Sequence, residues 1–168
     1  ALSWAASDIT INGVDIYDAD IATDTFSGKL AAINNFSSET GVIASAYFKN
    51  SFTMVEADFI GGAISLNGTA LSAMVTGDTL TTFVAKINLK TTTTGITATR
   101  EGDQLWLEGA NVQSVLFTGS AASAGALPDA IEYASIRLDS VNETPISIEL
   151  GDSADPDSHG FNEANVGA

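Results

Sequence analysis

The stretch Ile9–Gly13, Ile-Thr-Ile-Asn-Gly, returns 55 residues later as Ile64–Gly68, Ile-Ser-Leu-Asn-Gly, and this repeat decides the fold. In both copies apolar residues alternate with a hydroxyl residue, a pattern typical of a half-buried β-strand. Asn-Gly tolerates positive φ at both central positions of a type I′ turn, the tightest hairpin connection. A second short strand follows each Asn-Gly pair, so both copies are predicted to open with a β-hairpin.

Three further pairs of segments return in the same order, each displaced by 54 residues. Asp24-Thr25-Phe26 corresponds to Asp78-Thr79-Leu80, Ile33-Asn34 to Ile87-Asn88, and Thr40-Gly41-Val42 to Thr94-Gly95-Ile96. Four matches in nearly the same register indicate a structural duplication rather than chance.

An amphipathic helix is predicted after each hairpin, because apolar residues recur at the i, i+4, i+7 spacing of one helix face. These residues are Phe26, Leu30 and Ile33 in the first copy, and Leu80, Val84 and Ile87 in the second. Asp24 and Asp78 are expected to be the N-caps, because a carboxylate can accept hydrogen bonds from free N–H groups in a first turn. Gly41 and Gly95 lie past the expected helix ends, where the chain must turn back.

Two further strands are predicted in the remainder of each copy. Val42–Phe48 and Phe52–Val55 flank Lys49–Ser51 in the first copy, and Ile96–Arg100 and Gln104–Glu108 flank Glu101–Asp103 in the second. Each copy thus has the predicted order β-β-α-β-β, with one helix covering a small, mainly antiparallel sheet. The predicted class is α+β and β-rich, with lobes at residues 1–60 and 61–119.

Residues 120–168 are predicted to form a linker and a C-terminal β segment that returns toward the N-terminus. Ser120–Ala126 is small and low in complexity, which indicates the linker. Ser135–Leu138 and Pro145–Leu150 have the pattern of another hairpin. Gly151–Gly160 is an acidic loop, and Phe161–Val166 either starts a helix or stays extended.

The chain carries 21 acidic and 6 basic residues, a formal net charge of -15. A polyanion repels phosphate backbones and anionic lipid surfaces, so nucleic acid and membranes are not expected partners. Cysteine does not occur, which excludes disulfides, zinc-thiolate sites and thiol catalysis. No apolar run approaches the ~18 residues that a membrane-spanning helix needs.

The second copy resembles the IN motif of bacterial flagellins. The resemblance rests on the strand–Asn-Gly–strand opening, Gly77–Leu80, a helix ending in Ile87-Asn88, and Thr94–Ala98. The first copy matches more loosely, with Ala22-Thr23 before Asp24 and Ile43 after Gly41-Val42. Both copies together span residues 9–108. The C-terminal segments Ile146–Leu150, His159–Phe161 and Asn165–Ala168 also resemble, less specifically, the stretch that precedes the helical core of flagellins.

In flagellins this motif lies in the variable region between the N- and C-terminal helical segments. The resemblance therefore implies a surface-exposed structural domain of an extracellular bacterial filament. Other flagellin subunits are the implied partners, with antibodies or host receptors as further contacts. The heptad-bearing helices that polymerise flagellins are missing, so we expect an excised outer domain. The insert of a hook-associated filament protein is an alternative within the same class.

No enzyme is expected, and no catalytic, cofactor-binding or metal-binding residue is assigned. His159, the single histidine, lies in a hydrophilic loop, where a solvated side chain is expected rather than the base of a Ser-His-Asp triad. A Gly-x-Ser-x-Gly elbow and a phosphate-binding glycine loop with Lys are both missing. The carboxylate pairs Glu56/Asp58 and Glu101/Asp103 are expected to be surface charge, because 21 acidic residues bring pairs together by number alone. A hydrolase would need His159 buried beside a Ser or a carboxylate.

A calcium-loop template matches part of the acidic loop. Asp155, Asp157, His159 and Gly160 occupy its positions 1, 3, 5 and 6. Position 12 of the template requires Glu, but Val166 is found there, and histidine is a poor ligand for a hard cation. An acidic turn is expected, with weak calcium binding at Asp155 and Asp157 left open.

An adhesin module that recognises glycans or a host surface is the alternative from a different class. Its candidate aromatic residues are Trp4, Trp106, Phe117 and Tyr133, although most aromatic residues are expected in the core. Leu105 and Leu107 share one strand face, so Trp106 points the other way. Packing of Trp106 against a neighbouring lobe is favoured over exposure for contact.

Some segments match sites of glycosylation. The N-glycan acceptor pattern occurs at Asn35-Phe36-Ser37, Asn67-Gly68-Thr69 and Asn142-Glu143-Thr144, and the hydroxyls of Thr91–Thr94 are candidates for O-linked sugars. Such short matches arise often, so unmodified polar loops are expected.

Overall fold

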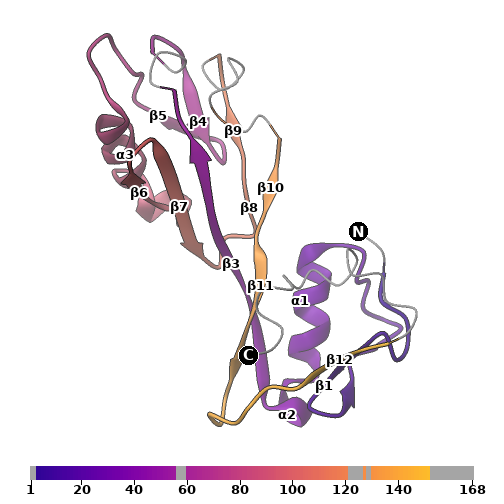
Figure 1. Ribbon diagram of the computed structural model, residues 1–168. Helices are drawn as coiled ribbons and strands as arrows, with labels where there is room; N and C mark the ends of the chain where they lie inside the picture. The colour runs from indigo at the N-terminus through magenta and orange to yellow at the C-terminus, as the bar shows by residue number, and fades with distance from the viewer. Residues whose placement is uncertain (1–2, 56–59, 121–126, 128–129, 152–168) are drawn as a thin grey trace. The chain divides into compact units, whose positions relative to one another are not determined.

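The computed structural model describes residues 3–55, 60–120, 127 and 130–151 (Figure 1). Contacts divide the chain into two compact units. The first comprises Ala1–Ala46 and Ser135–Ala168, and the second comprises Tyr47–Ala134. The second unit is therefore inserted into the chain of the first, a division that differs from the expected ranges 1–60, 61–119 and 120–168.

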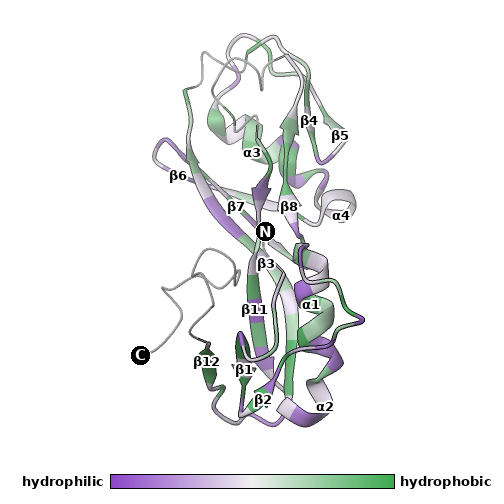
Figure 2. Ribbon diagram, turned by 90° about the vertical axis from the view of Figure 1, so that its right-hand side faces the viewer, coloured by the Kyte–Doolittle hydropathy of each residue, from purple (hydrophilic) through white to green (hydrophobic). Residues whose placement is uncertain are grey.

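The first unit contains the elements of the first repeat copy. They are β1 (Ile9–Ile11), β2 (Val14–Asp15), α1 (Phe26–Asn35), α2 (Ser37–Thr40), the start of β3 (Val42–Thr53), and, after the insertion, β11 (Ser135–Ser140) and β12 (Ile148–Leu150). One sheet has the order β12-β1-β2 with antiparallel pairs, and β11 is the neighbour of β3. Hydrophobic and hydrophilic residues alternate along β11 (Figure 2), as expected of a strand with one buried face.

The second unit contains the second copy and the remainder of β3. Its elements are β4 (Ile64–Leu66), β5 (Thr69–Leu71), α3 (Leu80–Asn88), α4 (Thr91–Thr94), β6 (Thr97–Glu101), β7 (Gln104–Ala110), β8 (Ser114–Val115), β9 (Phe117–Thr118) and β10 (Glu132–Tyr133). Strands β5-β4-β9 form one sheet, β3-β7-β6 run side by side in another, and β8 pairs with β10. The predicted α+β, β-rich class with mainly antiparallel sheets is confirmed.

The Asn-Gly turns have the backbone that the sequence predicts. Asn12 and Gly13 have φ values of 51° and 80°, and Asn67 and Gly68 have values of 48° and 77°. Positive φ at both central positions defines a type I′ turn, whose twist matches that of the flanking strands. Both hairpins, β1-β2 and β4-β5, are confirmed.

The two predicted helices are confirmed as α1 and α3, but their buried faces are partly shifted. The buried residues are Leu80, Phe83 and Ile87 in α3, and Lys29, Ala32 and Ile33 in α1. Phe26, Leu30 and Val84 are only partly buried, and they pack against the two cores.

Lys29 occupies the position in α1 that Phe83 occupies in α3. Its ammonium lies 4.5 Å from the centre of the Trp4 ring, a cation–π contact in the first core. Burial lowers the pKa of Lys29, while the charges of Asp24 and Asp8 act in the opposite direction.

The expected N-caps were displaced by one residue. Thr25 and Thr79 are the caps: the Thr25 hydroxyl accepts from Gly28 N at 3.0 Å, and the Thr79 backbone N–H donates to the Thr82 hydroxyl at 3.4 Å. Aspartate and threonine are both favoured N-cap residues, so an adjacent Asp-Thr pair leaves the position of the cap open by one residue.

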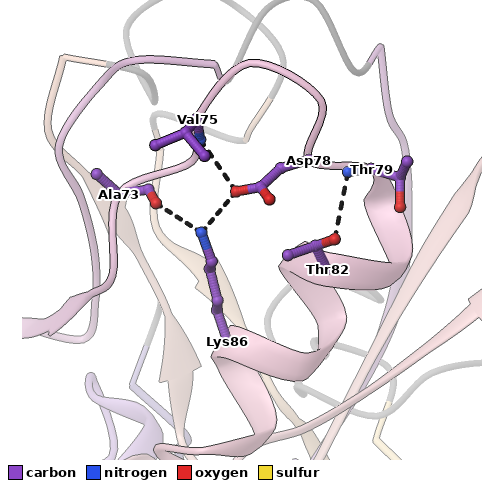
Figure 3. Close-up of polar contacts among 6 residues, drawn as sticks. All are labelled: Ala73, Val75, Asp78, Thr79, Thr82 and Lys86. Atoms are coloured by element: carbon purple, nitrogen blue, oxygen red, sulfur yellow. Dashed lines mark hydrogen bonds and ion pairs between the residues drawn. The ribbon is translucent and has the colours of Figure 1, made fainter.

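Asp78 instead accepts hydrogen bonds that hold the loop before α3 against that helix (Figure 3). One carboxylate oxygen accepts from Lys86 Nζ at 2.7 Å and from Val75 N at 3.0 Å, and Lys86 also donates to Ala73 O at 2.6 Å. The hydrogen bond from Lys86, followed by that from Val75, lowers the pKa of Asp78 below its ordinary value of 3.8.

Two expected hairpins were wrong. Strand β3 runs unbroken through Lys49–Ser51, because Tyr47–Thr53 pairs along its length with β7. Strand β12 does not pair with β11 but with β1, where Ile9 lies opposite Leu150 and Ile11 opposite Ile148. The pairing of β1 with β12 confirms the expectation that the C-terminal β segment returns toward the N-terminus. The last part of that segment, residues 152–168 with Asn165, lies outside the described residues.

Candidate functional site

The motif residues Asn34 and Asn88 each hold a helix end to a strand. Asn88 Nδ2 donates to Ala98 O at 2.9 Å, and Asn88 Oδ1 accepts from Ala98 N at 2.7 Å. Asn34 makes the same two bonds to Ala44, at 2.9 and 2.7 Å. An amide side chain carries one donor and one acceptor direction that match a peptide group, so each asparagine replaces a missing strand neighbour.

The side chains of the turn residues Asn12 and Asn67 join each hairpin to backbone groups outside it. Asn67 Oδ1 accepts from Leu116 N at 2.8 Å, and its Nδ2 donates to Ser114 O at 2.9 Å. Asn12 Oδ1 accepts from Ser147 N at 2.8 Å, and its Nδ2 donates to Thr40 O at 2.8 Å.

Thr40 and Thr94 end the short helices α2 and α4 in matching ways. The Thr94 hydroxyl donates to Lys90 O at 3.1 Å and accepts from Ile96 N at 3.2 Å, and Thr40 bridges Phe36 O and Val42 N at 2.9 and 3.1 Å. Thr94 is buried, so of the four candidates for O-linked sugars, Thr91–Thr94, it is not accessible, whereas Thr92 and Thr93 are exposed.

The second unit also contains an open groove with a cavity volume of ≈ 840 Å³. It lies on the sheet face formed by β3, β7 and β6, opposite the buried face that carries Leu105 and Leu107. Trp106 is central to this face, because it is paired with Ser51 of β3 on one side and with Thr99 of β6 on the other. Its ring is partly accessible, and its Nε1 is buried without a hydrogen-bond partner among the described residues.

Polar side chains surround Trp106 in the groove. The Tyr47 hydroxyl donates to Glu108 Oε1, and Lys49 Nζ lies 4.0 Å from Glu108 Oε2. Arg100 and Glu101 of β6 also line the groove. The sequence alone singles out Trp106 as a contact residue and Glu101 as surface charge. Tyr47, Lys49 and Glu108 meet in the groove through strand pairing, which alternation within one strand does not reveal.

The residues considered for catalysis and metal binding are not brought together where they can be located. Glu101 ends β6, and Asp103 lies in the turn that follows. Within the described ranges, no group of three or more histidine, aspartate or glutamate side chains is placed to hold a metal ion. Glu56, Asp58, Asp155, Asp157 and His159 lie outside those ranges.

Comparison with known proteins gives no family assignment: no family model matches the chain, and no curated protein matches its sequence. Among the residues that the structure covers, none of the helices is both long and apolar enough to cross a membrane.

Proposed function

We propose that the chain is a surface-exposed structural module of a flagellin-type extracellular filament. The observation that carries this proposal is the placement of the two motif asparagines. Asn34 and Asn88, which end the helices of the two IN-like segments, make the same pair of backbone hydrogen bonds in both units. The sequence motif thus corresponds to one repeated structural device, which supports the resemblance on which the proposal rests.

The pairing of β1 with β12 fits a module carried in the middle of a longer chain. Ile9 lies opposite Leu150, so the first and last described strands are antiparallel neighbours. An inserted module must leave and re-enter its host at nearby points, and adjacent end strands meet that requirement.

Charge gives such a module a second property. A net charge of -15 keeps neighbouring copies apart at low salt and favours a hydrated outer surface. In this role the module would form the antigenic surface of the filament and would meet other subunits, antibodies or host receptors.

Antibodies raised against the purified chain test the proposal on intact cells of the source bacterium. Immunogold electron microscopy is expected to label filaments along their length, and the antigen is expected in the sheared filament fraction. Labelling restricted to the filament base would point to a hook-associated protein. Antigen confined to the cell body would refute the filament role.

A further inference from the structure

The residue at the centre of the groove differs from the residue at the matching position of the first unit. The Val141 N–H donates to Gly41 O, and Gly41 corresponds to Gly95. Aligning β11 with β7 from this contact and from the β6-β7 register places Ile136, Arg137 and Leu138 at the positions of Leu105, Trp106 and Leu107. Arg137 is exposed and pairs with Asp139 at 2.9 Å. The Asn-Gly turns and the motif asparagines Asn34 and Asn88 are repeated in the two units, but this tryptophan is not. The fold therefore does not require a tryptophan at this position.

The groove face carries charged side chains of both signs, Lys49, Glu101 and Glu108. Arg100 does not add to them, because it pairs with Leu105 of the buried face and its guanidinium donates to Thr81 of α3. One positive and two negative side chains do not form a strong field that would select a polyanion or a polycation. The groove lining combines one large aromatic ring with hydroxyls and with charged groups that donate and accept hydrogen bonds, a combination that fits a neutral ligand with many hydroxyl groups.

We propose that the Trp106 groove binds neutral oligosaccharides. A pyranose ring presents one face of C–H groups and an edge of hydroxyls. The C–H face would pack on the accessible part of the Trp106 ring, which removes apolar surface from water. This site is independent of the filament role, since a saccharide site can be carried by a structural module or by an adhesin.

Glu108 can accept hydrogen bonds from sugar hydroxyls through its carboxylate oxygen Oε2. The Tyr47 hydroxyl occupies Oε1, and Lys49 lies beside Oε2 at a longer distance of 4.0 Å, which leaves Oε2 with hydrogen-bonding capacity. Hydrogen bonds to ionised groups are stronger than those between neutral groups, so Glu108 and Lys49 would orient the ligand along β7. The Thr97 and Thr99 hydroxyls line the β6 side.

The size of the groove agrees with this ligand. A cavity volume of ≈ 840 Å³ lies within the range of roughly 300–1,000 Å³ typical of small-molecule sites. The groove is open rather than enclosed, and its lining extends over β3, β7 and β6, so a short oligosaccharide fits better than a compact enclosed ligand. Affinity is expected to be weak, with dissociation constants on the order of 1 mM, because one stacked ring and a few exposed hydrogen bonds contribute most of the binding.

The test uses the full chain with three neutral probes, maltotriose, cellotriose and N,N′-diacetylchitobiose. Saturation-transfer-difference NMR is expected to show at least one probe bound, with the strongest transfer to its C–H protons. Trp106→Leu is expected to weaken that binding at least about tenfold, which corresponds to about 1.4 kcal/mol. Arg137→Ala, at the corresponding position in the first unit, is the matched control and is expected to bind like the wild type.

Trp106→Phe covers the case in which Trp106→Leu fails to fold, because it retains a ring and is expected to bind with intermediate affinity. Glu108→Gln keeps the shape of the side chain but removes its charge, and is expected to weaken binding as well. Binding by none of the probes at about 20 mM, well above the expected dissociation constant, overturns the proposal. Equal binding by the wild type and both Trp106 variants overturns it too.

Discussion

The side chain of Asn88 and the backbone of Ala98 form a closed pair of hydrogen bonds, with Nδ2 to O at 2.9 Å and N to Oδ1 at 2.7 Å. Ala98 is the second residue of β6, which lies at the edge of the sheet beside β7 among the described strands. The amide of Asn88 thus provides hydrogen-bond partners for the N–H and C=O of Ala98 on the side of β6 that faces the end of α3. These two hydrogen bonds join Asn88, the last residue of α3, to β6, the strand that follows the short helix α4.

Asn88→Ala is expected to destabilise the second unit by on the order of 2 kcal/mol, because both backbone groups of Ala98 lose their partner in a part-buried setting. Hydrogen exchange measured by mass spectrometry should rise across α3 and β6. Asn34→Ala is the matched variant and should raise exchange in α1 and the start of β3 instead. If each variant raised exchange equally in both units, the hydrogen bonds of Asn34 and Asn88 would not act within separate units.

Gly28→Ala is expected to destabilise the first unit although Gly28 lies inside α1, where alanine normally gains up to about 1 kcal/mol over glycine. A Cβ at this position would lie 1.9 Å from Ala22 O, so the chain before the helix would have to move. Gly13→Ala is the control: it meets nothing within 4 Å, and only the strain of its positive φ, about 1 kcal/mol, applies. Urea unfolding should rank Gly28→Ala as the less stable variant, and the reverse order would contradict this account of the contact with Ala22.

Asp78 and Lys86 should make the stability of the second unit sensitive to acid. Because the pKa of Asp78 is lowered in the folded state, its contribution is fully present above the ordinary value of 3.8 and is lost as pH falls below that value. The stability difference between the wild type and Asp78→Asn should therefore be largest above pH 3.8 and should shrink at lower pH. Trp106 fluorescence in a Trp4→Phe background can follow urea unfolding of this unit.

Lys86→Gln provides the matched control, because it removes the ammonium that donates to Asp78 Oδ2. In that background Asp78→Asn should change acid sensitivity less than it does in the wild type. A stability difference for Asp78→Asn that stays constant from about pH 2.5 to 6 would mean that the contact with Lys86 does not depend on the charge of the carboxylate.

Local chemistry was sufficient to predict some parts of the fold. Asn12-Gly13 and Asn67-Gly68 specify their turns through backbone preference alone, and the apolar spacing between Leu80 and Ile87 specifies a helix. Such features depend on residues within a few positions of one another, so one sequence contains the information needed.

Strand partners were not predictable in the same way. Lys49–Ser51 is polar because Lys49 and Ser51 lie on the outer face of a sheet, yet a polar run between apolar segments also indicates a turn. Deciding between the two requires the partner strand β7, which lies more than 50 residues away in the sequence. The Trp106 groove was missed for the same reason: Tyr47 and Lys49 meet Glu108 only through that pairing.

Excision of the second unit tests whether the first is a complete fold interrupted by an insertion. In the second copy, β6 and β7 are joined by the short turn Gly102-Asp103; in the first, β3 and its neighbour β11 are separated by the whole inserted unit. The Val141 N–H donates to Gly41 O at 2.8 Å, which places the far ends of β3 and β11 together without any residue of the second unit.

Replacing residues 48–134 by Gly-Asp would connect Tyr47 directly to Ser135 through the turn that nature uses in the other copy. The product is expected to fold, because its core and its helix–strand contact lie entirely within the first unit. The core surrounds Ile9, Ile33 and Val42, and the contact is the hydrogen bonding between Asn34 and Ala44. Dispersed amide signals by NMR, with slow exchange at Ile9 and Ile11 opposite β12, are the expected result. A collapsed spectrum would show that the first unit depends on the second for its stability. Asn34→Ala in the same shortened chain should reduce protection of β3, since it removes the two hydrogen bonds that join the end of α1 to Ala44.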